Sequence, residues 1–190
     1  ISAFGGIVSC NYKINKTLAK ELNNIFLEVV IANGFDNEAL KILKKKKNLR
    51  LIDATNLTIK NIIRFNSSNN SILTQSEDIE KFNIKNFKIV SKKKPSKSQL
   101  KNLIFAFNVC RYVKSNAIVL ASQETTVGIG SGQPSRLDSC QIAIDKMKTF
   151  QDSNENVVAA SDAFFPFVDG IEKLVQSGVS AVIQPSGSIK

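Results

Sequence analysis

Apolar residues recur with helical spacing in the first part of the chain. The pattern covers residues 16–31 and ends near Gly34. Its apolar positions are Leu18, Leu22, Ile25, Phe26 and Val29. Side chains three and four positions apart share one face of a helix, so the spacing predicts a helix over residues 16–31. A second, shorter helix is expected over residues 38–46. Short stretches rich in β-branched or aromatic residues predict strands over residues 49–52, 62–65, 71–75 and 87–90.

Helices and strands alternate more regularly after Pro95, which follows a run of lysines. This position predicts a boundary between residues 1–94 and residues 95–190. A long apolar helix is expected over residues 98–113. Strands are then predicted over residues 117–121, 125–129, 157–160 and 179–184, and helices over residues 135–149 and 169–177. This alternation predicts an α/β fold with a mixed sheet.

Two of the predicted helices begin with residues that commonly cap a helix. Ser135 with Asp138, and Asp169 with Glu172, each have the spacing of a capping box. In such a box each side chain satisfies a backbone N–H of the first turn, so we expect helix starts at both places.

The composition indicates a folded cytoplasmic protein. With 190 residues, 43% of them apolar, the chain can bury a core, and no apolar run is long enough to span a bilayer. Its three cysteines are Cys10, Cys110 and Cys140, which are far apart and form no CxxC pair. An odd number of isolated cysteines is typical of reduced thiols, so we expect a cytoplasmic location and no membrane partner.

The net charge of +10 raises the possibility of a basic nucleic-acid-binding module. However, only Arg50, Arg64, Arg111 and Arg136 are arginines, and the lysine runs contain no interleaved aromatic residues. Groove-reading proteins favour arginine and strand-binding proteins favour aromatic stacking, so a solvated lysine surface is the better interpretation. Such a field would still concentrate phosphorylated substrates.

The segment from Ala160 to Gly170 holds three phenylalanines around Pro166, with Asp162 and Asp169 on either side. Proline disfavours both a central strand and a helix interior here. A buried aromatic corner is the commoner reason for such a motif. The flanking carboxylates favour a site for a flat, polar heterocyclic ligand, since aspartate is rarely buried without a partner.

A glycine-rich loop over residues 128–132 leads into the helix that carries Arg136 in its first turn. Glycines allow backbone amides to approach a ligand, and a helix start favours anions. A cation at this end is unfavourable to the helix, which suggests a phosphate partner for Arg136. A tight turn with a surface arginine explains the pattern equally well.

Two further segments combine polar residues with an element end. Asn116 follows the long helix, where a C-cap is the commoner role, although its amide could orient a substrate amine or carbonyl. The segment from Gln184 to Ser188 follows the last strand, where α/β sheets usually bind ligands. A plain turn is equally consistent with that segment.

Taken together and in order, these motifs resemble a known family. The chain is similar to the formyltransferase portion of AICAR transformylase/IMP cyclohydrolase over essentially its whole length. The matching segments are Ser2-Ala3-Phe4-Gly5-Gly6, Lys114-Ser115-Asn116-Ala117, Gly128-Ile129-Gly130-Ser131-Gly132-Gln133, Ser135-Arg136 with Asp138, Ser161-Asp162-Ala163-Phe164-Phe165-Pro166-Phe167 and Gln184-Pro185-Ser186-Gly187-Ser188.

The resemblance implies an enzyme of purine biosynthesis, and IMP cyclohydrolase activity as well in the full protein. It would transfer a formyl group from 10-formyltetrahydrofolate, the folate co-substrate, to the 5-amino group of AICAR ribotide. The implied fold is a set of cytidine-deaminase-like, three-layer α/β/α units with mixed sheets and no zinc. Residues 1–94 would be the end of a first unit with its connecting strands, and residues 95–190 most of a second. A homodimer is also implied.

The resemblance also assigns roles to residues. Asn116 would position the reacting amine, and Arg136 would contact the nucleotide. Phe4 and Phe164 would border the AICAR pocket, and the folate pocket would be bordered by Pro166, Phe167 and Asp169. Oxygens of Ser115 and Asp162 could bind the potassium ion of the family, because hard cations prefer oxygen ligands.

Two departures from the family bear on activity. The catalytic Lys-His pair of the family lies upstream of Ser-Ala-Phe-Gly-Gly, and this chain contains no histidine. We therefore expect a fragment of a longer product that lacks the cyclohydrolase domain and is inactive alone. Asn70 also stands near the position where the family usually has a glycine pair. The remaining alternative is a stand-alone phosphate- or nucleotide-binding domain without catalysis.

Overall fold

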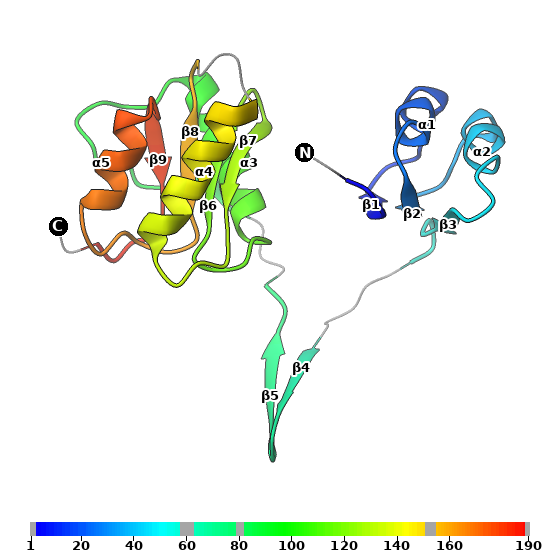
Figure 1. The fold of residues 1–190 in the computed structure, drawn as a ribbon, viewed down its shortest axis with the longest axis horizontal. Coiled ribbons are helices and arrows are strands. Elements are labelled where there is room, and N and C mark those ends of the chain that lie inside the picture. Colours follow the sequence, from blue (N-terminus) through cyan, green and yellow to red (C-terminus); the bar gives the residue numbers. More distant parts are fainter. Residues whose placement is uncertain (1–2, 58–62, 79–81, 151–154, 189–190) are drawn as a thin grey trace. The chain divides into compact units, whose positions relative to one another are not determined.

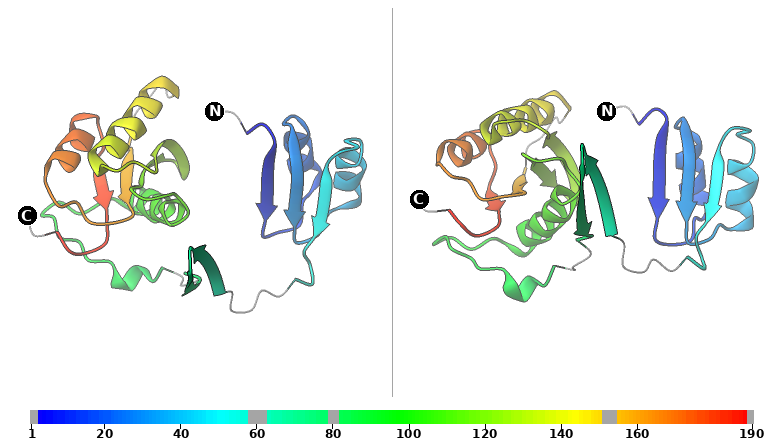
Figure 2. Two further views of the ribbon diagram at one scale, coloured as in Figure 1. Left: turned by 60° about the horizontal axis from the view of Figure 1, so that its bottom comes forward. Right: turned by 90° about the horizontal axis from the view of Figure 1, so that it is seen from below.

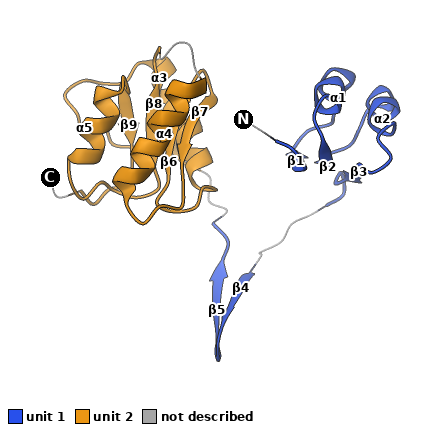
Figure 3. Ribbon diagram, viewed as in Figure 1, with its two compact units in different colours: residues 1–79 blue, residues 80–190 orange. Residues whose placement is uncertain are grey.

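The computed structural model describes residues 3–57, 63–78, 82–150 and 155–188 (Figure 1). The chain divides into two compact units, residues 1–79 and residues 80–190 (Figure 3). Residues 82–94 belong to the second unit, where Phe82 stacks on Phe107 with ring centroids 4.7 Å apart. The division into two deaminase-like units at Pro95 stays a prediction.

The first unit contains a parallel three-stranded sheet in the order β1-β2-β3. The strands are β1 (Gly6–Cys10), β2 (Leu27–Ala32) and β3 (Arg50–Asp53), and they are connected by α1 (Lys16–Asn23) and α2 (Asn37–Leu43). The side chain of Asn15 caps α1 by accepting a 2.9 Å hydrogen bond from the N–H of Leu18. Both helices pack on one face of the sheet and bury Ile14, Ala19, Leu22, Leu27, Val30, Ala32, Ala39 and Leu43.

The predicted helix over residues 16–31 was wrong in its second half. α1 ends at Asn23, and β2 starts at Leu27. The N–H of Asn24 bonds back to the carbonyl of Glu21, which closes the last turn. The apolar run of β2 fits a helical period, but its β-branched residues pair with strands on both sides. The predicted strand over residues 87–90 is also absent, because these described residues belong to no ladder.

Two strands of the first unit form an antiparallel hairpin, β4 (Ile63–Ser68) and β5 (Ser71–Ser76). The turn contains only two residues, and Asn69 adopts a positive φ of 47°. β4 therefore extends beyond the predicted strand over residues 62–65 to include the polar residues 66–68, and residue 62 lies outside the described residues. The register places Ile63, Phe65 and Ile72 on one exposed face of the hairpin.

The second unit is a mixed four-stranded sheet in the order β7-β6-β8-β9. β6 (Ile118–Ser122) runs antiparallel to β7 (Thr125–Gly130) and to β8 (Val158–Ser161), whereas β8 and β9 (Ala181–Ile183) are parallel. α3 (Lys97–Cys110) covers one face, and α4 (Arg136–Phe150) and α5 (Asp169–Gln176) cover the other (Figure 2). The prediction of an α/β fold with mixed sheets is confirmed.

In the second unit one capping box was not predicted and one predicted box is absent, while the predicted Ser135 box stays a prediction. Ser96 and Gln99 form a complete capping box at the start of α3, which sequence reasoning missed. At α5 the N-cap residue is Val168, which has no side-chain cap, so the predicted Asp169 box was wrong. Asp169 instead accepts a 2.7 Å hydrogen bond from the N–H of Gly170. Among the described helices, none is long and apolar enough to cross a membrane.

Candidate functional site

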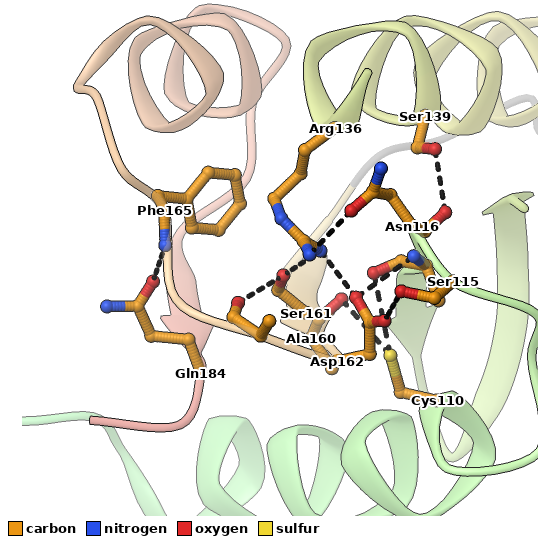
Figure 4. Close-up of polar contacts among 12 residues, drawn as sticks. Cys110, Ser115, Asn116, Arg136, Ser139, Ala160, Ser161, Asp162, Phe165 and Gln184 are labelled. Atoms are coloured by element: carbon orange, nitrogen blue, oxygen red, sulfur yellow. Dashed lines mark hydrogen bonds and ion pairs between the residues drawn. The ribbon is translucent and has the colours of Figure 1, made fainter. Parts of the chain in front are cut away.

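The topology of the second unit gathers three polar segments at one edge of its sheet. β6 is antiparallel to β8, and Ile118 at the start of β6 pairs with Ser161 at the end of β8. Ile118 also pairs with Gly130 at the end of β7. The segment before β6, the segment after β8 and the start of α4 therefore meet at this edge, as Figure 4 shows.

Arg136 is the hub of a polar network at this edge, hereafter the Arg136 network (Figure 4). Its Nη1 bonds to the carboxylate of Asp162 and, at 2.8 Å, to the hydroxyl of Ser161. Its Nη2 donates to Oδ1 of Asn116 at 2.8 Å. Three of its five N–H donors are thus engaged by residues that the structure describes. A cation at the start of α4 is unfavourable to the helix, and the carboxylate of Asp162 offsets its charge. The anionic partner of Arg136 in this structure is therefore a residue of the chain itself.

Asp162 is the anionic partner in the Arg136 network. The side chains of Arg136 and Asp162 are only 12% and 18% exposed. The carboxylate also accepts from the N–H of Ala117 at 3.0 Å and from the hydroxyl of Ser115. Burial raises the pKa of Asp162, but the hydrogen bonds from Ser115, Arg136 and Ala117 outweigh it and hold the pKa below its ordinary value of 3.8. The carboxylate is therefore ionised at neutral pH.

Asn116 connects the Arg136 network to the loop before α4. Its Nδ2 donates to the carbonyl of Gln133 at 2.8 Å and to that of Pro134 at 3.0 Å. Its own carbonyl accepts a 2.8 Å bond from the hydroxyl of Ser139, and its peptide bond with Ser115 is cis. The residue at the C-cap of α3 is Arg111, so the C-cap interpretation of Asn116 was wrong. The amide of Asn116 fixes the entry to α4 instead.

The aromatic loop, residues 163–168, contains both a buried ring, as in an aromatic corner, and exposed rings, as in a ligand site. Phe165 is 5% exposed and belongs to the core, where its ring lies against Gly170. Phe164 and Phe167 are 41% and 64% exposed. One ring therefore anchors the loop, while two rings remain available to a ligand.

The glycines before α4 have a packing role that the sequence did not reveal. A Cβ on Gly128 would lie 2.1 Å from the carbonyl oxygen of Ala143, and one on Gly130 would lie 1.9 Å from that of Ser139. β7 therefore packs directly against the backbone of α4. Gly132 has a positive φ of 69° in the turn, and its N–H bonds to the carbonyl of Lys114 at 2.9 Å. The first two glycines accommodate a helix rather than a ligand.

The structure brings together four of the predicted site residues, Ser115, Asn116, Arg136 and Asp162 (Figure 4). Phe4 belongs to the first unit, so its place in the same pocket stays a prediction. Ser139 and Ser161, which are both fully buried, were missed as members of the Arg136 network. The only signal in the sequence was a serine at the end of an otherwise apolar strand.

Two oxygen-bearing side chains could bind a cation at this edge. The hydroxyl of Ser115 and the carboxylate of Asp162 are hydrogen-bonded to each other. Both are hard oxygen donors of the kind that potassium prefers. Among the described residues, no group of three or more His, Cys, Asp or Glu side chains could hold a metal ion.

Comparisons with known proteins identify relatives along the whole chain. A family model described as AICARFT/IMPCHase bienzyme matches residues 1–146. The bifunctional purine biosynthesis protein PurH of Ligilactobacillus salivarius is 42% identical over 193 residues, and that of Aquifex aeolicus is 43% identical over 190 residues. Each match covers 100% of this chain and 37% of the relative. The chain thus spans little more than a third of the length of these curated relatives.

Proposed function

Because the chain belongs to the AICARFT/IMPCHase bienzyme family, we propose that it forms part of the formyl-transfer site of a bifunctional enzyme of purine biosynthesis. The reaction would move a formyl group from 10-formyltetrahydrofolate to the 5-amino group of AICAR ribotide. The observation that carries this proposal is the Arg136 network at the sheet edge, together with the exposed rings of the aromatic loop that follows Asp162.

The chemistry of the substrate explains why positioning is the main task of such a site. The 5-amino group is a weak nucleophile, because its lone pair is delocalised into the ring and the carboxamide. Holding this amine at attack distance from the formyl carbon removes much of the entropic barrier. Proton transfer still requires a general base. This chain contains no histidine, so we assign proton transfer to the Lys-His pair of the longer protein.

Within this scheme Arg136 and Asn116 hold the nucleotide and its amine. Two N–H donors of Arg136 lie outside its bonds to Asp162, Ser161 and Asn116. A guanidinium already held by a carboxylate is preorganised, so it binds a phosphate or a carboxamide oxygen without losing further rotamer freedom. Asn116, locked to Arg136, would transmit that orientation to the reacting amine.

The aromatic rings would bind the flat parts of both substrates. We propose that Phe164 and Phe4 contact AICAR, and that Pro166, Phe167 and Asp169 border the pterin of the folate. Phe164 and Phe167 are partly exposed in the described residues, which leaves part of each ring available for stacking. We also propose a deaminase-like arrangement of the units and a homodimer.

A potassium ion would bind through Ser115 and Asp162 by exchanging their mutual hydrogen bond for ligation. When bound, it would add positive charge beside Asp162. Oδ1 of Asp162 would still accept hydrogen bonds from Arg136 and from the N–H of Ala117.

Calorimetry of the complete protein with AICAR ribotide tests the proposal. We expect Arg136→Ala to raise the Kd about tenfold or more, as for the loss of a charged hydrogen bond to a ligand. Arg64→Ala is the matched control, because Arg64 in β4 also pairs with a carboxylate, that of Glu77, which follows β5. Equal affinities of wild type and Arg136→Ala would remove Arg136 from the site. A nucleic-acid-binding module would instead bind polyanions with a steep dependence on salt.

A further inference from the structure

The loop over residues 184–188 is joined to the aromatic loop by a closed ring of hydrogen bonds. The N–H of Phe165 donates to Oε1 of Gln184 at 2.9 Å. Nε2 of Gln184 donates to the hydroxyl of Ser188 at 2.8 Å, and this hydroxyl donates to the carbonyl of Phe165 at 2.9 Å. Each donor and acceptor is used once. Two side chains from one loop therefore satisfy both backbone polar groups of a single residue in the other.

Gly187 of the same loop packs against the ring of Phe164. A Cβ on Gly187 would lie 2.8 Å from Cδ1 of Phe164 and 3.2 Å from Cε1. Gly187 has a positive φ of 133°, so both its backbone conformation and the close ring favour glycine. Phe164 nevertheless remains 41% exposed. One side of the ring thus rests on the backbone of Gly187, and part of the ring faces outward.

The neighbouring ring, that of Phe165, anchors the aromatic loop in the core. Phe165 lies in the core, where a Cβ on Gly170 would approach its ring to 2.7 Å. Consecutive side chains of the aromatic loop therefore have different environments, one in the core and one at the surface. With the backbone between them held by Gln184 and Ser188, Phe164 has little freedom to change its position.

From this arrangement we infer that Gln184, Gly187 and Ser188 are positioning residues that present the ring of Phe164 to the planar base of the substrate. The inference rests on the proposed function, in which Phe164 contacts AICAR. A fixed ring stacks on a flat heterocycle without the entropic cost of ordering a side chain. The loop that follows the last strand acts through Phe164 and need not contact the substrate itself.

A pair of glycine variants of the complete protein tests this role. We expect Gly187→Ala to raise the Kd for AICAR ribotide about tenfold in calorimetry, the loss typical of one stacked base. Gly178→Ala is the control, because Gly178 also has a positive φ, of 96°, but nothing within 4 Å of an added Cβ. That variant should lose some stability and keep its affinity. Equal changes of Kd in the two variants would overturn the inference.

A double-mutant cycle separates a role through Phe164 from a direct one. We expect the single variant Phe164→Ala and the double variant Phe164→Ala, Gly187→Ala to bind AICAR ribotide with equal affinity. Once the ring of Phe164 is absent, Gly187 no longer positions anything that contacts the substrate. Additive losses in the double variant would contradict the inference. If wild type itself failed to bind the ribotide, the proposed function would fall first, so the two failures are distinguishable.

Variants of Gln184 test the hydrogen-bonded ring without altering a glycine. Gln184→Ala should raise the Kd, whereas Gln184→Glu should recover most of the affinity because it keeps an acceptor for the N–H of Phe165. Thermal unfolding of each variant reports any loss of stability. A lower Tm in Gln184→Ala with an unchanged Kd would show a purely structural role and would overturn the inference.

Discussion

Among the described residues, the parallel sheet of the first unit and the mixed sheet of the second unit differ in how many of their faces helices cover. In the second unit, helices cover both faces, and residues 118–121 of β6 are all buried. In the first unit, α1 and α2 cover one face, and β1 alternates between half-buried and exposed positions. On the other face, Ile7 and Ile52 are 68% and 47% exposed.

This difference explains where side chains can be held precisely. The Arg136 network lies at the edge of the doubly covered sheet, and its ion pair is mostly buried. The aromatic pair Phe4 and Phe26 precedes strands of the singly covered sheet and is 80% and 48% exposed. A sheet packed on both faces resists shifts of its strand ends, so polar groups there keep their geometry.

The largest expected effect concerns the cores of the two sheets. Leu120→Ala should lower the free energy of unfolding by about 3 kcal/mol, because Leu120 is fully buried and its removal leaves a cavity. Ile52→Ala, on the open face of the first sheet, should change it by about 0.5 kcal/mol or less. Urea unfolding of residues 1–190 measures both. Similar losses in the two variants would contradict the difference between the sheets.

A smaller effect is expected in the Arg136 network and depends on pH. The folded pKa of Asp162 is lowered, so its ionised form stabilises the fold above about pH 4. This contribution is lost as the pH falls through the lowered value. Asp162→Asn should therefore be less stable than wild type by about 2 kcal/mol at pH 6, and the difference should shrink toward pH 2.

The control for this pH dependence is Asp138→Asn, at an exposed position in the first turn of α4. Its stability should remain within about 0.5 kcal/mol of wild type at pH 6. If the difference between wild type and Asp162→Asn were the same at pH 6 and pH 2, the carboxylate would not stabilise the fold through its charge.

The smallest effect concerns the reactivity of the cysteine thiols, which can be compared between the two units in the wild-type chain. Burial raises the pKa of Cys110 to about 12 and that of Cys140 to about 11, both in the second unit. Cys10 in the first unit is only half-buried. We expect a disulfide reagent at pH 8 to label Cys10 quickly in the native chain, and to label Cys110 and Cys140 only after unfolding. Fast labelling of all three would contradict the tight packing of the second unit.

The sequence predicted the second unit better than the first. Its apolar strands and long helices were found, since their patterns are extended and consistent. In the first unit the run from Leu27 to Ala32 has a helical spacing, yet it forms a strand because pairing on both sides outweighs periodicity. The family was also predicted and is confirmed.

The site was predicted less completely than the fold. Asn116, Arg136 and Asp162 were identified as site residues, but their bonds to one another depend on the antiparallel register of β6 and β8. That register follows from long-range pairing, which a local pattern does not reveal. The packing of Gly128 and Gly130 against α4 was missed for the same reason.

The most direct test is the steady-state formyl-transfer rate of the complete protein with Asn116→Ala, measured beside the Kd for AICAR ribotide. If Asn116 orients the reacting amine, kcat should fall about a hundredfold, as for a misplaced reactant, while the Kd changes little. The opposite result, an unchanged kcat with a weakened Kd, would contradict the proposed role of Asn116 in orienting the reacting amine at the formyl-transfer site.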